Sequence, residues 1–185
     1  MRWRNTTTGF GSLAIAFHWL MLVLIVAVYA LMELKGISRK GTPLREGMAA
    51  WHYMLGLSVF GLTWLRLLVR ATGPAPRIEP PPAAWEARLA SLVHLLLYAL
   101  MIGLPVLGWL TLSAQGDRIP FFGIELPALV GPDKGMARIW KDVHETGATI
   151  GYFLIGLHAA AALFHHYVRR DNTLTLMWRP RRAAP

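Results

Sequence analysis

The sequence predicts an all-α membrane protein in which four transmembrane helices form one up-and-down bundle. Hydrophobic residues make up 55% of its 185 residues, charged residues only 16%, and the mean hydropathy is +0.40. This composition lies outside the usual range of soluble domains. Charged residues divide the chain into four long uncharged intervals, each close to or above the ~18 residues of a spanning helix. These intervals cover residues 5–32, 47–65, 89–116 and 146–168.

The four helices are expected at residues 12–34, 47–70, 86–114 and 142–168. The first uncharged run is too long for a secretory signal peptide, and no small-residue cleavage site follows it, so we expect a retained helix. In the third helix Pro105 removes one backbone hydrogen bond, which predicts a bend. Because the connections are short, residues 1–185 are expected to form a single membrane domain surrounded by lipid.

Two connections differ in character. The second contains five prolines between Pro74 and Pro82, which predict an extended linker. The third, from Gln115 to Lys141, is the longest and mixes aromatic residues with turn residues, so it is expected to fold back over the end of the bundle. A short helix is expected within it, from about Asp133 to Trp140.

Cysteine usage and charge exclude several classes of protein. The absence of cysteine excludes disulfides, thiolate metal sites, iron–sulfur clusters and covalently attached c-type haem. The net charge of +9 does not indicate a nucleic-acid partner, because its distribution fits a membrane protein. Lys and Arg are more frequent in the two termini and the second connection, which predicts that both termini lie in the cytoplasm. The terminal residues counted here include Arg2, Arg4, Arg179, Arg181 and Arg182.

The chemistry of the chain is concentrated in its seven histidines, all in or beside the predicted helices. Ionisable residues inside a membrane are costly and usually mark a functional site. His144 and His158 stand fourteen residues apart on the last helix. At 100° per residue their side chains point within roughly 40° of each other and lie roughly 21 Å apart along the axis. One helix face therefore offers imidazoles at two depths, which predicts two stacked b-type haems.

Depth in the membrane suggests a partner for each of these histidines. His52 lies roughly 9 Å from the periplasmic end of the second helix, near the level of His144, so these two can hold one haem. His18 is about two turns into the first helix, on the side of His158, and these two can hold the second haem. His94 is equally deep in the third helix and competes with His18 as the partner of His158. Spacing alone leaves this choice open.

Two further residues have alternative interpretations. His165 lies seven residues beyond His158, and is either an interfacial histidine or lines a quinone pocket together with His94. In such a pocket an imidazole can hydrogen-bond a carbonyl oxygen and pass a proton. Arg66 stands fourteen residues after His52 on the same helix face. It either pairs with a haem propionate or a quinone oxygen, or is a helix-end arginine that snorkels to the interface.

A histidine-lined zinc or iron transporter is the main alternative to a cytochrome. Such a protein would normally add carboxylates within the membrane as ligands or proton acceptors. The acidic residues near the spans stand only at helix ends: Glu33, Glu46, Asp142 and Glu145. The pattern therefore favours haem. His166 is expected to face lipid headgroups, and Tyr29 to belong to the aromatic belt.

These residues resemble the bacterial cytochrome b561 family of four-helix di-haem proteins over nearly the whole chain. The matching segments are FHWL around His18, MELKG at 32–36, WHYMLG around His52, VHLLLY around His94, GLPVLG at 103–108, and HETGATIGYFLIGLHAAAALFHHY at 144–167 followed by RDNTL. The last segment is long and specific, whereas the others are short. The resemblance implies that His18 and His158 ligate one haem and that His52 and His144 ligate the other.

The best-understood type of this family acts as a superoxide oxidase, so the resemblance implies a superoxide:ubiquinone oxidoreductase. Electrons from periplasmic superoxide would pass through two b haems to ubiquinone. Relatives of the same architecture serve as haem-bearing membrane anchors of hydrogenases and dehydrogenases, which implies an alternative role beside a partner redox protein. Basic residues in the first periplasmic connection either attract anionic superoxide over a long range or are ordinary loop charge. They are Lys35, Arg39, Lys40 and Arg45.

Overall fold

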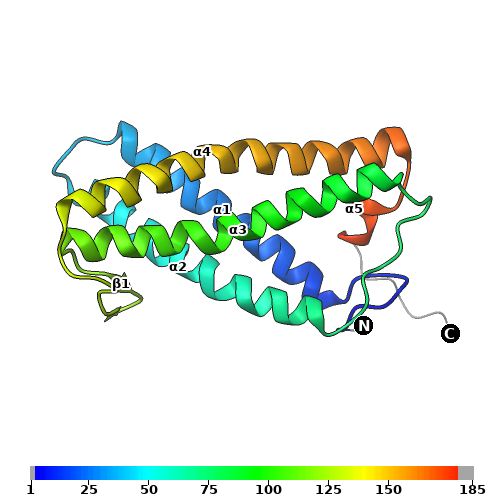
Figure 1. The fold of residues 1–185 in the computed structure, drawn as a ribbon, viewed down its shortest axis with the longest axis horizontal. Helices are drawn as coiled ribbons and strands as arrows, with labels where there is room; N and C mark the ends of the chain where they lie inside the picture. The colour runs from blue at the N-terminus through cyan, green and yellow to red at the C-terminus, as the bar shows by residue number, and fades with distance from the viewer. Residues whose placement is uncertain (1–2, 179–185) are drawn as a thin grey trace. The chain divides into compact units, whose positions relative to one another are not determined.

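The computed structural model describes residues 3–178, and most of them are helical (Figure 1). The long helices are α1 (Ser12–Ile37), α2 (Pro43–Ala71), α3 (Ala84–Gln115) and α4 (Lys134–Phe164). A π-helical turn (His165–Arg169) continues α4, and the short α5 (Thr173–Leu176) follows it. Of the basic residues used to predict orientation, Arg2, Arg179, Arg181 and Arg182 lie outside the described residues.

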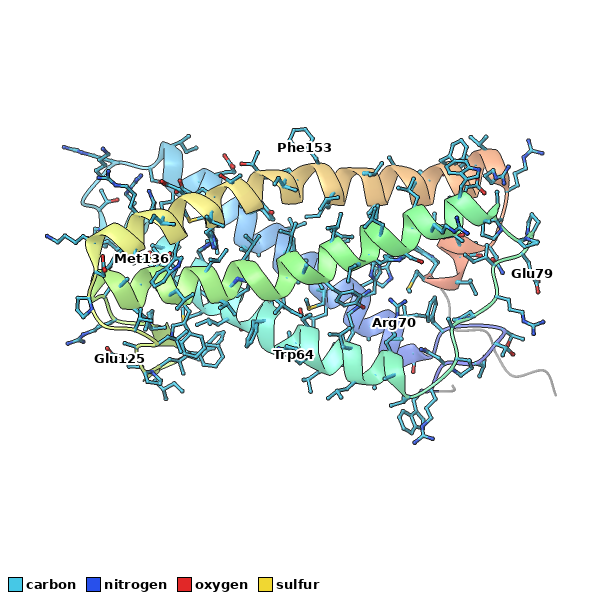
Figure 2. The ribbon with its side chains drawn as sticks, in the orientation of Figure 1. Trp64, Arg70, Glu79, Glu125, Met136 and Phe153 are labelled. Carbon is cyan, nitrogen blue, oxygen red and sulfur yellow. The ribbon has the colours of Figure 1, made fainter. Side chains whose placement is uncertain are left out.

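Four helices are long and apolar enough to cross a membrane: Ser12–Ile37, Pro43–Ala71, Ala84–Gln115 and Lys134–Arg169. Large apolar side chains on their surfaces are exposed, as helices that face lipid require. Phe153, for example, is 75% exposed and projects outward from α4 (Figure 2). The prediction of an all-α protein with four transmembrane helices is confirmed.

The chain divides into two compact units, and each contains a segment of every long helix. Unit 1 comprises residues 1–20, 62–99 and 151–185. Unit 2 comprises residues 21–61 and 100–150. The division falls within the helices rather than in the connections. Each unit is therefore a short bundle of four helical segments with its own connections.

In unit 1 the segments outside the helices are tied together by specific hydrogen bonds. The side chain of Asn5 accepts a hydrogen bond of 3.0 Å from the backbone of Gly11, and a side chain at Gly11 would overlap the backbone of Trp3 and Arg4. This close approach requires glycine at position 11. The backbone N–H of Arg77 donates to the carbonyl of Thr7 at 2.9 Å, which joins the proline-rich linker to the N-terminal segment.

The C-terminal segment of unit 1 folds back on the same region. The indole N–H of Trp19 on α1 donates to the carbonyl of Met177 at 2.8 Å, and the rings of Trp19 and Trp178 meet edge to face. Asn172 bonds the linker in both directions, because its side-chain oxygen accepts from the N–H of Glu79 and its own N–H donates to the carbonyl of Glu79. These contacts fix the position of the residues that follow α4.

In unit 2 the long third connection forms a small hairpin. Strands β1 (Pro120–Phe121) and β2 (Ile124–Glu125) pair antiparallel, and the turn between them has positive φ at Phe122 and Gly123. The ring of Phe122 lies edge to face on Trp51 of α2, with centroids 6.1 Å apart. The expectation that this connection folds back is confirmed, although its strands are too short to be recognised from the sequence.

Three helix starts differ from the predicted ones, and the smallest difference is in α3, which begins at Ala84 rather than at 86. The separate short helix expected at about 133–140 is the first part of α4, which begins at Lys134 rather than at 142. The carboxylate of Asp133 accepts the N–H groups of Gly135 at 2.9 Å and Met136 at 3.0 Å, and this cap starts a helix that runs on without a break. Similarly α2 begins at Pro43 rather than at 47, since proline suits the first helical turn.

Candidate functional site

Unit 2 brings together His52 of α2 and His144 of α4. Their ring centroids lie 6.2 Å apart and the ring planes are inclined by 73°. Nδ1 of His52 lies 3.0 Å from the carbonyl oxygen of Val28, and Nδ1 of His144 lies 2.8 Å from that of Leu104. A carbonyl oxygen only accepts, so each Nδ1 donates and each Nε2 is left as a lone-pair nitrogen. This is the arrangement in which histidine binds a metal through Nε2.

Glycines border this pair. A side chain at Gly108 of α3 would lie 3.5 Å from Cε1 of His144, so the bare backbone of α3 faces the imidazole edge. One turn after His52, a Cβ at Gly56 would meet nothing within 4 Å. At Gly147, in contrast, a Cβ would lie 2.7 Å from a methyl group of Leu104, which shows close packing of α3 and α4. Gly147 therefore serves helix packing, whereas Gly56 leaves open space beside a histidine.

Unit 1 brings together three histidines from three helices. His158 of α4 lies between His18 of α1, with ring centroids 6.3 Å apart, and His94 of α3, with centroids 5.3 Å apart. The His18 and His158 planes are inclined by 71°, close to the angle of the pair in unit 2. Both histidines that spacing offered as partners of His158 are thus in contact with it.

The centroid distances can be compared with those of two imidazoles on opposite sides of one metal ion. An imidazole nitrogen binds a metal at about 2 Å and lies about 1.2 Å from its ring centroid, so two opposed rings have centroids roughly 6.4 Å apart. The His52–His144 and His18–His158 distances of 6.2 and 6.3 Å match this value. The His94–His158 distance of 5.3 Å is about 1 Å too short. The His52–His144 and His18–His158 pairs are therefore the ones whose spacing would fit a haem iron.

Arg66 of α2 lies beside the pair in unit 1. Its Nη2 is 3.2 Å from Nδ1 of His18, and its Nε donates to the hydroxyl of Tyr98 at 3.2 Å. Arginine has only donors, so Nδ1 of His18 is the acceptor here and the ring proton is on Nε2. Ligation of iron through Nε2 requires the opposite tautomer. In the tautomer that such ligation requires, Nδ1 of His18 could not accept from Arg66, so this contact and ligation through Nε2 exclude each other.

The residues of the first connection, in unit 2, have different surroundings. Arg45 is partly buried, and its guanidinium donates to the carbonyls of Lys35 and Ser38, so it caps the C-terminus of α1. Arg39 and Lys40 are exposed in the loop between α1 and α2. Arg45 therefore has a structural role, whereas the two loop residues present their charge to solvent.

Three remaining predicted residues also have defined positions. The hydroxyl of Tyr29 donates to the carbonyl of Ala148 at 2.8 Å, so it ties α1 to α4 within unit 2. His166 lies edge to face against Tyr167, with centroids 4.8 Å apart. His165 is in unit 1, and its Nδ1 lies 2.5 Å from a carboxylate oxygen of Asp171. Among the residues that the structure describes, no group of three or more His, Asp or Glu is arranged to hold a bare metal ion.

Sequence reasoning missed Asp171 and Tyr98. Tyr98 stands four residues after His94 on α3, a spacing that places both on one helix face. Asp171 belongs to the RDNTL segment after α4, and a carboxylate six residues from a histidine at a helix end was the available signal. Its contact with His165 depends on the left-handed conformation of Arg170, with φ of 55°, which turns the chain back.

The pair of Asp171 and His165 should make the C-terminal fold of unit 1 sensitive to acid. Burial by itself raises the pKa of the Asp171 carboxyl, but hydrogen bonds from His165 and Thr173 outweigh burial and lower the pKa below its ordinary value of 3.8. A carboxyl whose pKa is lower in the folded state stabilises the fold above about pH 4, and this contribution is lost as pH falls through the lowered pKa. Fluorescence of the Trp19–Trp178 contact should report loosening in acid. The acid response should be smaller in Asp171→Asn and unchanged in Asp117→Asn; equal responses in all three proteins would refute this assignment.

A family model and similar known proteins agree on one family for this chain. A family model described as prokaryotic cytochrome b561 matches residues 9–180. Cytochrome b561 homolog 1 of Escherichia coli K12 is 41% identical over 173 residues, which cover 94% of this chain and 98% of that protein. The probable superoxide oxidase CybB of Yersinia pestis is 34% identical over 168 residues, covering 91% and 94%. Cytochrome b562 of Cereibacter sphaeroides is 28% identical over 179 residues, covering 94% and 97%.

Proposed function

This chain belongs to the prokaryotic cytochrome b561 family of membrane electron-transfer proteins, and we propose that it oxidises superoxide and reduces ubiquinone. The proposed reaction converts two superoxide anions, one ubiquinone and two protons into two dioxygen molecules and one ubiquinol. The observation that carries the proposal is the pair of bis-histidine geometries, one in each unit. The similarity to a probable superoxide oxidase supports the choice of substrate.

His52 and His144 would hold one b-type haem, and His18 and His158 the other. The two centroid distances near 6.3 Å support these pairs, and the shorter distance disfavours His94 as a ligand. The carbonyls of Val28 and Leu104 would fix the first two rings in the tautomer that binds iron. When bound, each haem supplies a one-electron iron couple.

Arg66 would pair with a haem propionate. Its present contact with His18 is incompatible with ligation through Nε2, so haem binding would displace the guanidinium from that ring. Haem would bring its own propionate groups to the site, and arginine binds carboxylates with two parallel hydrogen bonds. The hydroxyl of Tyr98 would keep the arginine close to its position.

We propose that the protein lies in the bacterial inner membrane with both termini in the cytoplasm. The excess of Lys and Arg in the termini and the second connection supports this orientation. The first and third connections would then face the periplasm, where superoxide would be oxidised. His94 and His165 would line the quinone site, near the helix ends that face the cytoplasm.

Positive charge at the first connection should accelerate superoxide oxidation. Arg39 and Lys40 are exposed, and Lys35 is partly exposed at the end of α1. Replacing all three with glutamine should lower the second-order rate constant for superoxide roughly 10-fold at low salt, because long-range attraction is lost. The difference should shrink as added salt screens the charges. Stopped-flow reduction of the haem bands by superoxide measures this rate.

A matched variant carries the same change in charge on unit 1, at Arg4, Arg77 and Arg88. It should oxidise superoxide at the wild-type rate at every salt concentration. Equal slowing of both triple variants would mean that total charge rather than a local field controls the rate. No slowing of either variant at low salt would leave the first connection without a role in attraction.

The proposed activity can be tested with the isolated chain in detergent. Superoxide should reduce the haem bands, and a soluble ubiquinone should reoxidise them with formation of quinol. Haem reduction without quinol formation would instead favour a role as an electron-carrying anchor subunit that needs a partner dehydrogenase or hydrogenase. A purified protein without haem bands would contradict both cytochrome roles.

A further inference from the structure

Asp171 is a buried carboxylate that none of the roles above uses. Its side chain is 2% exposed, and its Oδ2 lies 2.5 Å from Nδ1 of His165. Its Oδ1 accepts the backbone N–H of Thr173 at 2.9 Å, and its own N–H donates to the carbonyl of His165 at 3.1 Å. Backbone hydrogen bonds with Thr173 and His165 therefore fix the position of Asp171. Its Oδ2 accepts a hydrogen bond from the imidazole of His165.

This contact determines what the other nitrogen of His165 can do. The carboxylate accepts and Nδ1 donates, so Nε2 is directed away from Asp171. When the ring is protonated, the adjacent carboxylate stabilises its positive charge through a charge-assisted hydrogen bond. The side chain of His165 is 17% exposed, so its outer edge is still reachable. With Nδ1 bonded to Asp171, Nε2 is the nitrogen of His165 that can exchange a proton with a ligand.

A cavity of about 340 Å³ lies beside Asp171. Its walls are Pro80, Pro81, Pro82, Val168, Arg169 and Asp171. A volume of this size holds several water molecules. Asp171 is one of the lining residues, although its side chain is almost fully buried.

The other charged or titratable groups near the pair of Asp171 and His165 contact other residues. Arg169 belongs to the same π-helical turn as His165, and its guanidinium bonds the carboxylate of Glu86 on α3 at 2.8 Å. Glu79 of the linker meets this region through backbone contacts with Asn172. The neighbouring His166 stacks on Tyr167. Asp171 is consequently the carboxylate that bonds His165 directly.

We propose that Asp171 is a positioning residue that holds Nδ1 of His165 and directs its Nε2 at a carbonyl oxygen of the bound quinone. This inference rests on the quinone site proposed above. For each quinone that accepts two electrons from two superoxide anions, His165 gives one proton from Nε2 to the oxygen it faces. The other oxygen takes its proton from water. After quinol leaves, water at the exposed edge of the ring, which is 17% exposed, returns a proton to Nε2 of His165, while Nδ1 keeps its bond to Asp171.

The test compares two separate half-reactions of the purified haem-loaded protein over a range of pH. In wild type the reoxidation of reduced haem by soluble ubiquinone should slow as pH rises, because the reaction consumes protons. In Asp171→Asn the pH profile should change and reoxidation at pH 8 should be at least about tenfold slower, because Nδ1 of His165 has lost its acceptor and Nε2 is no longer directed at the quinone. Asp171→Glu should restore most of the wild-type profile. Reduction of haem by superoxide should be unchanged in all these proteins.

Glu86→Gln is the matched control, since it removes a buried carboxylate of the same unit that pairs with Arg169 rather than with His165. It should keep the wild-type pH profile. A wild-type profile in Asp171→Asn would overturn the role of Asp171, as would the same altered profile in Glu86→Gln. If Asp171→Asn does not retain haem, His165→Gln decides: its reoxidation should be slow at every pH, and a wild-type profile would overturn the proposal.

The proposed function fails in a different way from this inference. If wild-type protein binds haem but quinone does not reoxidise it, the quinone site itself is wrong. If wild-type protein is reoxidised and only the pH profiles disagree, the quinone reaction stands and the pair of Asp171 and His165 is not its proton donor.

Discussion

Replacing His158 with alanine is expected to remove one of two haems and to lower quinol formation from superoxide by at least about 100-fold. Replacing a residue that only hydrogen-bonds a metal ligand typically lowers metal affinity or activity 10–100-fold. Replacing the ligand itself should therefore lower activity further. His158 is in contact with both His18 and His94, so either choice of partner predicts the same loss. Haem per chain and quinol formation are the two measurements. The remaining haem should still be reduced by superoxide.

Variants of its two neighbours separate the possible pairs. His18→Ala should lose the same haem as His158→Ala, whereas His94→Ala should retain both haems and slow only the reaction with quinone. His166→Ala, on the same helix end, should retain both haems and normal activity. Full haem retention in His158→Ala would contradict the assignment, and loss of haem in His94→Ala with retention in His18→Ala would exchange the partners.

Replacing His144 with alanine is expected to remove the other haem and to slow superoxide-driven haem reduction by at least about 100-fold. Nδ1 of His144 is held by the carbonyl of Leu104, the ring borders the bare backbone of Gly108, and the imidazole that it contacts is His52. The haem of unit 1 should remain reducible by dithionite and should be reoxidised by quinone. Stopped-flow absorbance measures both reactions separately.

Glu145→Gln provides the control for this variant, because Glu145 is the next residue and pairs with Lys141 at 3.3 Å on the exposed side of α4. It should retain two haems and wild-type rates. Fast superoxide-driven reduction in His144→Ala would show that superoxide does not react at the site in unit 2. Loss of both haems would show that the two sites do not assemble independently.

Much of the fold could be predicted because a membrane imposes a simple rule on sequence. The four uncharged intervals gave four helices, since hydrocarbon tolerates few charges and demands that backbone hydrogen bonds be satisfied internally. The start of α4 was predicted too late for the same reason. Its first turns carry Lys134, Arg138 and Lys141, so they do not resemble a membrane span. The hairpin at 120–125 was not predicted, because two-residue strands are too short to show a sequence periodicity.

The histidine pairs could be proposed from helical rise and depth, because both are fixed by α-helix geometry. The choice between His18 and His94 could not, since it depends on a difference of 1.0 Å between two centroid distances from His158. Asp171 was not predicted, although a carboxylate six residues after a histidine at a helix end was an available signal. Its contact with His165 exists only because the chain turns back after α4, and no local pattern encodes that turn reliably.

The most direct test of two bis-histidine sites is an electron paramagnetic resonance spectrum of the oxidised, purified protein with haem quantified in the same sample. The account predicts two haems per chain, both low-spin ferric, because two imidazole ligands give a strong axial field. The ring planes inclined by 73° and 71° predict similar spectra for the two sites. A single haem per chain, or a high-spin signal from iron with one imidazole, would contradict the account.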